Sequence, residues 1–178
     1  MKLSIPSLPC RFACLLPAVL ACSPTSSLPG QSLGTFSVVG TLGTNTCGAG
    51  LGLTNPWDFQ IEMSENGATL YFAKTDGSGQ VSGPISGNSA VLMWTTTVND
   101  DAADAGASPC DLTLTATFNF DLNSATSPTA FTGSVLYGYS VATGDGSTVD
   151  CTDQLASSGG AYATLPCNAT YSLSGTQQ

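Results

Sequence analysis

The side chains of this chain that could carry out chemistry are its carboxylates and its cysteines. The 178 residues include 12 Asp and Glu, three Lys and Arg and no His, and Lys74 is the only base after Arg11. Nucleophile pairs that need His, His-based zinc sites and Arg clamps on phosphate therefore lack their parts. Only carboxylate chemistry is left, such as that of glycosidases. Because twelve acids make a chance pair easy to find, we expect no enzymatic activity and no cofactor, with a carboxylate-based hydrolase as the alternative.

The charge balance also bears on partners. The formal net charge is −9, whereas binding DNA or RNA requires a cationic surface that neutralises phosphates. We therefore expect no nucleic-acid partner.

Two groups of acids have enough oxygen atoms to suggest calcium, which takes six to eight oxygen ligands. They are Asp100, Asp101 and Asp104 in one stretch, and Asp145 and Asp150 in another. Neither stretch has the alternating acids and final Glu of an EF-hand loop. We expect no metal site and interpret these residues as solvated loop acids that keep the protein soluble.

The N-terminus has the layout of a signal peptide. Lys2 and Arg11 precede an apolar run over 12–21, after which Ser, Pro, Thr and Gly take over. A run of ten residues is too short to cross a bilayer as a helix. If Cys10 and Cys14 leave with the signal, five cysteines remain, and an odd number leaves one thiol unpaired.

If Cys22 carries a lipid, an even number of cysteines remains for pairing. The stretch PAVLAC resembles a bacterial lipobox, which implies cleavage before Cys22 and lipid modification of that residue. The alternative is a soluble secreted protein with a stray thiol. We accordingly expect a signal peptide over 1–21, a lipidated Cys and flexible linker over 22–33, and a single β domain over 34–178.

The four remaining cysteines, Cys47, Cys110, Cys151 and Cys167, would then form two disulfides in an oxidising compartment. Three pairings are open. We favour Cys151 with Cys167, which closes the longest loop, and Cys47 with Cys110.

The elements that position these residues are strands. Residues 110–122 and 57–64 alternate between apolar and polar, which is typical of strands with one buried face. Asn66 and Gly67 predict a tight hairpin. The full set of predicted strands is 34–42, 57–64, 68–74, 79–86, 89–98, 110–122, 131–141 and 167–174. One short helix is predicted near 152–158.

Eight strands with short connections predict an all-β fold, an eight-stranded antiparallel up-and-down barrel, with a β-sandwich as the alternative. In such a barrel all four cysteines and nine of the 12 acids fall at one end. The linker joins the other end, so the acidic loops should face away from the membrane and carry function.

Alternating large residues could line a ligand cavity, but their size favours a packed interior. They are Trp57, Phe59, Ile61, Met63, Leu112, Leu114, Phe118, Phe120, Tyr137 and Tyr139. Small residues could leave a gap, namely Gly40, Gly83, Ala116 and Gly133.

Two family resemblances follow from these residues. Gly34-Thr-Phe36 is similar to the Gly-x-Trp that opens the lipocalin barrel, with Phe in place of Trp. The stretches GTFSVVGTLGTNTCGAGLGL, WDFQIEMSENGATLYF and CTDQLASSGGAYATLPCNATYSL resemble an uncharacterised family of bacterial lipoproteins. That resemblance implies a β fold in the cell envelope, lipid-anchored and extracytoplasmic, in the outer membrane.

We therefore expect an anchored lipoprotein that serves as an interaction or surface-structural module through its acidic, disulfide-bearing loops. Its partners would be the membrane, through the lipid, and a protein. The alternative is a lipocalin-like barrel that binds a small apolar ligand.

Overall fold

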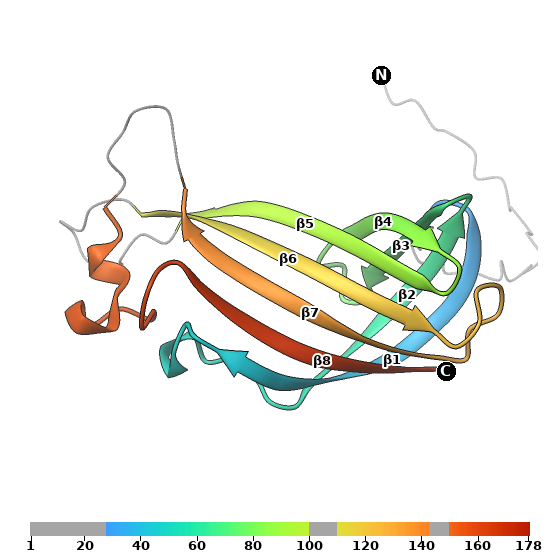
Figure 1. Cartoon of the computed structure of the whole chain (residues 1–178), viewed down its shortest axis with the longest axis horizontal. Helices are drawn as coiled ribbons and strands as arrows, with labels where there is room; N and C mark the ends of the chain where they lie inside the picture. The colour runs from blue at the N-terminus through green and yellow to red at the C-terminus, as the bar shows by residue number, and fades with distance from the viewer. Residues whose placement is uncertain (1–27, 100–109, 143–149) are drawn as a thin grey trace, which may run out of the picture.

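The computed structural model describes residues 28–99, 110–142 and 150–178, which form eight strands and three short 3-10 helices (Figure 1). The strands are β1 (Gln31–Asn45), β2 (Trp57–Asn66), β3 (Thr69–Lys74), β4 (Gln80–Ser86), β5 (Ser89–Asn99), β6 (Asp111–Leu122), β7 (Ala130–Val141) and β8 (Cys167–Gln177). The 3-10 helices are η1 (Ala49–Leu51), η2 (Thr152–Gln154) and η3 (Ala156–Ser158). Every predicted strand is present, with bounds within three residues of those expected.

The strands form one closed antiparallel barrel in chain order. Each strand pairs with its sequence neighbours, and β1 pairs with β8 from Phe36 opposite Gln177 to Asn45 opposite Ala169. This confirms the up-and-down barrel. The β-sandwich alternative is wrong, because a sandwich consists of two packed sheets rather than one closed sheet.

The alternating pattern places one side of each strand in the core. On β6, Leu112, Ala116, Phe118 and Phe120 are buried, whereas none of the residues between them is. The core inside the barrel consists of Leu33, Phe36, Val38, Ile61, Met63, Leu70, Phe72, Ile85, Ala90, Leu92, Ala116, Phe118, Phe120, Leu122, Phe131, Val135, Tyr171 and Leu173. All of these residues, every strand and both disulfides lie within 28–178, so this stretch contains the complete barrel.

The hairpin between β2 and β3 is also confirmed, with a shifted turn. Asn66 pairs with Thr69, so the two turn residues are Gly67 and Ala68. Gly67 has a φ of 63°, and no other residue type among those described has a positive φ. One left-handed residue at the first turn position is what a two-residue II′ hairpin needs.

The two ends of the barrel differ. We call the end where β1, β3, β5 and β7 finish the disulfide end, at the left in Figure 1, and the opposite one the turn end. Cys47 follows β1, Cys110 precedes β6, Cys151 follows β7 and Cys167 begins β8. All four cysteines therefore lie at the disulfide end, as the predicted topology requires.

The favoured disulfide pairing is wrong. Cys47 bonds Cys167 and Cys110 bonds Cys151, each with Cα atoms 4.9 Å apart. Barrel closure is the reason, because it brings the end of β1 beside the start of β8. The start of β6 and the end of β7 are likewise neighbours, because Leu112 pairs with Val141 and the Ala142 amide donates to the Asp111 carbonyl. Each disulfide thus joins the ends of neighbouring strands.

Residues 150–166 fold over the disulfide end, and we call them the cap. The predicted helix is replaced there by η2 and η3, separated by Leu155 in an extended conformation. Leu155 is held extended because it bridges to Tyr162, whose carbonyl accepts from the Ala156 amide. The disulfides, Leu112 and Tyr162 form a second buried cluster beneath the cap.

The start of β1 shortens the predicted linker. Gln31 and Ser32 pair with Glu65 and Ser64 of β2, and the Ser64 hydroxyl donates to the Pro29 carbonyl at 2.7 Å. Residues 31–33 therefore belong to the barrel rather than to a flexible linker. None of the helices in the described ranges has the length and hydropathy to span a membrane.

Candidate functional site

Phenylalanine rings fill the part of the barrel interior toward the turn end, and aromatic-lined cavities lie toward the disulfide end. The hollows at the turn end itself are lined mainly by polar and glycine residues. Toward the turn end, rings meet edge to face: Phe36 on Phe131 at 5.6 Å between centroids, Phe72 on Phe118 at 4.9 Å and Phe120 on Phe131 at 4.9 Å. The expectation of a packed interior is thus right for this half. Above these rings lie two cavities that share Tyr137 as a wall.

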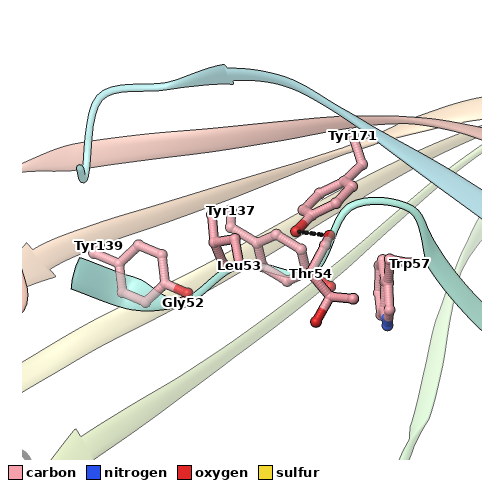
Figure 2. A pocket seen from close by; sticks show the side chains of 7 residues that line it. All are labelled: Gly52, Leu53, Thr54, Trp57, Tyr137, Tyr139 and Tyr171. Carbon is pink, nitrogen blue, oxygen red and sulfur yellow. Dashed lines mark hydrogen bonds between the residues drawn. The ribbon is translucent and has the colours of Figure 1, made fainter. Parts of the chain in front are cut away.

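The first, which we call the mouth cavity, has a volume of about 230 Å³ (Figure 2). It is lined by Gly52, Leu53, Thr54, Trp57, Tyr137, Tyr139 and Tyr171. The tyrosines come from β7 and β8, Trp57 opens β2, and the remaining wall is the loop between β1 and β2. The cavity therefore has aromatic rings on the barrel side and Gly52, Leu53 and Thr54 on the loop side.

Two hydrogen bonds fix that loop. The Tyr171 hydroxyl donates to the Thr54 carbonyl at 3.0 Å, drawn in Figure 2, and the Leu42 amide donates to Asn55 Oδ1 at 3.1 Å. The Tyr171 ring lies 5.3 Å from the Trp57 ring and 6.4 Å from that of Tyr137. The aromatic wall is consequently held by ring packing and by the loop together.

The second, which we call the seam cavity, has a volume of about 200 Å³. It lies between β4 and β5, in the half of the barrel nearer the disulfide end. Its lining residues are Phe72, Lys74, Ser78, Gly79, Gln80, Val81, Trp94, Ala116, Phe118 and Tyr137.

The seam is a local break in the β ladder. Between β4 and β5 only Ile85 with Ala90 and Ser86 with Ser89 are paired, whereas β5 and β6 pair along their whole length. Pro84 explains the break. The Ile85 amide donates to Ala68 on the β3 side, so position 84 would have to donate toward β5, and proline has no N–H to donate.

Lys74 projects into this hollow half. It is the last residue of β3 and pairs with Ile61, on the inner face of β2. Its Nζ lies 4.8 Å from the Trp57 ring centroid and 5.4 Å from that of Phe59, and these two rings stack at 4.1 Å. Cation–π attraction to the paired rings therefore holds the ammonium inside the barrel.

The pKa values of the three tyrosines of the mouth cavity are all raised. Burial raises the pKa of Tyr137 well above its usual range, and Tyr139 and Tyr171 add to the rise. Burial also raises the pKa of Tyr139 and of Tyr171. All three are thus neutral hydrogen-bonding groups near neutral pH.

The structure gives a different account of the small residues expected to leave gaps. Ala116 does line the seam cavity. Gly83 and Gly133 instead allow close backbone approach, since a Cβ at either would meet the carbonyl of Val91 or Asn119. A Cβ at Gly40 would lie 3.3 Å from Leu173 and from Trp57, so that space is already filled.

Of the predicted cavity-lining residues, Trp57, Tyr137 and Tyr139 line the mouth cavity, and Phe118 and Tyr137 line the seam cavity. Ile61, Met63, Leu112 and Phe120 are buried packing residues. Sequence reasoning missed Lys74, Trp94 and Tyr171. The signal for Lys74 was present, because it follows Leu70 and Phe72 at alternate positions of one strand.

The other predicted site residues are placed as follows. Cys22, Asp100, Asp101, Asp104 and Asp145 lie outside the described residues. Asp150 is exposed and accepts from the Thr152 amide and hydroxyl at 3.0 and 2.8 Å, which lowers its pKa. In the described parts of the chain, no group of three or more Asp, Glu, His or Cys could hold a metal ion.

A comparison with protein-family models, with curated proteins and with solved structures finds no match for the chain.

Proposed function

We propose that this protein is a binding protein, a lipid-anchored extracytoplasmic barrel that holds a small apolar molecule in its hollow half. One observation carries the proposal, namely the pair of aromatic-lined cavities that meet at Tyr137 above a solid phenylalanine base. Concave, mostly apolar sites with a few polar groups are where proteins bind small molecules. Each cavity is smaller than a typical drug-sized site, so the ligand is small or spans both.

The linings favour binding over catalysis. None of the described residues that line either cavity is Asp or Glu. A carboxylate-based hydrolase needs two such groups on either side of the scissile bond. The polar side-chain groups include the tyrosine hydroxyls, Thr54, Ser78, Gln80 and one ammonium, which would orient a ligand rather than cleave it.

The end of the barrel at which β1 begins supports an outward-facing site. β1 begins at the turn end, whereas both cavities lie toward the disulfide end. A lipid on Cys22 would therefore hold the solid end of the barrel toward the membrane and leave the hollow end accessible. The two disulfides are compatible with an extracytoplasmic location.

The hypothesis of a protein-interaction module rests on the acidic loops at the disulfide end. Four of their nine acids, Asp100, Asp101, Asp104 and Asp145, lie outside the described residues, and the hypothesis stays a prediction. The ligand-binding barrel has the cavities in its favour. We therefore place the binding function first and the loop interaction second.

The test is titration of residues 28–178, disulfides formed, with prodan, an uncharged polarity-sensitive fluorophore. We expect saturable binding at one site. Ala116→Leu should weaken it about tenfold or more, because Ala116 is fully buried and its side chain would grow into the seam cavity.

Thr117→Leu is the matched control, because Thr117 is the next residue of β6 and points out of the barrel. It should leave the affinity unchanged. Absence of saturable binding to a protein that melts cooperatively would refute the proposal, and equal affinity of both variants would place the ligand outside the seam cavity.

A further inference from the structure

Lys74 is the one cation in the described part of the chain, and it lies inside the barrel. Its side chain is half-buried, and it forms part of the wall of the seam cavity. Surface lysines usually keep their ammonium group in bulk water while the stem packs. Here the group instead lies over Trp57 and Phe59, on the inner face of β2.

No carboxylate of the described residues lies within 4.0 Å of the Lys74 Nζ, whose close contacts are those with the two rings. Hydrogen bonds from Ser78 are the main cause of the lowered pKa of Asp76, and the charge of Lys74 reaches that carboxyl only at longer range, as a minor cause. Asp76, two residues further on, is exposed and accepts from the Ser78 amide at 2.9 Å. The ring faces attract the charge without accepting its N–H bonds conventionally, so a hydrogen-bond acceptor placed in the cavity would find free donors.

The rest of the seam cavity is suited to an apolar body. Phe72, Val81, Trp94, Ala116 and Phe118 contribute its hydrophobic wall. Trp94 is 40% exposed although it faces inward, which shows that the hydrophobic wall is open to solvent at this point. An apolar cavity with one ammonium at its edge matches a molecule with an apolar body and one anionic group.

We propose that the seam cavity binds a small amphipathic carboxylate, its apolar part against Phe72, Trp94 and Phe118 and its carboxylate on Lys74 Nζ. This inference rests on the proposed function and names its ligand class. The net charge of −9 would not draw an anion from a distance. Recognition is therefore short-range, through the charge-assisted hydrogen bond formed when the carboxylate reaches Lys74.

A cationic ligand is the opposite case. The faces of Trp57 and Phe59 toward Lys74 are already occupied by its ammonium. A second cation at the same rings would meet like charge in a site of low polarity. The same cavity that favours a carboxylate thus disfavours an amine.

The experiment compares octanoate, octanamide and octylammonium, which share one apolar body and carry a negative, neutral or positive head. Residues 28–178 are titrated with each, by calorimetry and by tryptophan fluorescence. The chain has two tryptophans, Trp57 and Trp94, and both line the cavities. We expect octanoate to bind about tenfold more tightly than octanamide, and octylammonium to bind most weakly.

Lys74→Met keeps the length and apolar stem while it removes the charge. It should lower the affinity for octanoate about tenfold and the affinity for octanamide by less, because the amide carbonyl forms only a hydrogen bond to a neutral acceptor, whereas Lys74→Arg should retain the preference. Equal binding of octanoate and octanamide by the unmodified protein, or tightest binding of octylammonium, would overturn the carboxylate inference and leave the binding function standing. A folded protein that binds none of the three, nor prodan, would overturn both. The comparison of the three heads on the unmodified protein decides the matter even if Lys74→Met fails to fold.

Discussion

Tyr137 is the side chain that the two cavities share, because it lines both of them. The ring lies 6.2 Å from that of Trp57 and 6.4 Å from that of Phe118, so it joins the aromatic wall to the phenylalanine base. Burial is the main reason that its pKa is raised. Ionising this hydroxyl would create a negative charge in a buried site among the rings of Trp57, Phe118 and Tyr171, which is energetically unfavourable.

This desolvation makes stability fall at alkaline pH. The folded pKa of Tyr137 lies above the value of about 10 in an unfolded chain, so its contribution is complete below that pH. It is lost as the pH rises through the folded pKa. From about pH 9 to about pH 11 we expect the free energy of unfolding to fall about 1 kcal/mol more in the unmodified protein than in Tyr137→Phe, measured by urea titration. Equal slopes for the two proteins would contradict this account.

The sequence predicts the place of a single residue when the pattern of its own strand is enough. It does not predict a role that depends on contact with a residue of another element. The lumen aromatics were identified because alternation alone assigns them to one face of a strand. Lys74 and Tyr171 were missed, since their roles depend on residues of other elements and not on the pattern of their own strands. Lys74 needs the rings of β2 beside it, and Tyr171 needs the Thr54 carbonyl 117 positions away.

At the scale of elements, β4 is the strand that breaks the regularity of the barrel. Six of the other strands have 10 to 15 residues, whereas β3 and β4 have six and seven. Pro84 removes the donor toward β5, and no residue of β4 before Ile85 pairs with β5. The alternating pattern predicts β4 but not the seam. Whether the ladder breaks depends on which adjacent strand each backbone N–H faces, and alternation of side chains does not give that.

Elsewhere the elements are held by tight packing between a glycine and a ring. Gly175 of β8 is buried beneath Phe131 of β7, and a Cβ there would collide with that ring. Gly175→Ala should therefore destabilise the barrel by about 1–3 kcal/mol through overpacking. Gly138→Ala is the matched control on β7, where the nearest atom to an added Cβ is Oδ1 of exposed Asn168 at 3.3 Å, and it should change stability by less than about 0.5 kcal/mol. Urea unfolding of both variants checks the pair, and a similar cost at both positions would count against the overpacking argument.

At the scale of the whole molecule, the pairing of β8 with β1 closes the barrel and determines which cysteines lie close enough to bond. The eight strands and their order were predictable, because each hairpin is local and its pattern is clear. The disulfide pairing was not, since it follows from the contact between the first and last strands. Loop length favoured Cys151 with Cys167, whereas closure places Cys47 beside Cys167.

The two disulfides should differ in their effect on stability. They link residues 120 and 41 positions apart, for which chain entropy gives about 5 and about 4 kcal/mol. Replacing Cys47 and Cys167 by Ala should therefore destabilise the protein at least as much as replacing Cys110 and Cys151, measured by urea unfolding.

The pairing itself can be checked by digestion with a protease that cuts at Asp. The non-reduced digest should contain a linked peptide with Cys47 and Cys167. A linked peptide with Cys47 and Cys110 would contradict the topology at the disulfide end.

The placement of Lys74 in the lumen has a consequence for detecting this protein. Trypsin cleaves after Lys and Arg, and beyond Arg11 the chain offers it the single bond between Lys74 and Thr75. In the folded barrel that bond follows directly after a paired strand, with its lysine held against Trp57 and Phe59. The native protein should pass through a tryptic digest whole, and the unfolded chain should give two fragments too long for routine peptide sequencing. A proteomic survey by tryptic peptides would therefore overlook it, while one based on a protease that cuts at Asp would find it.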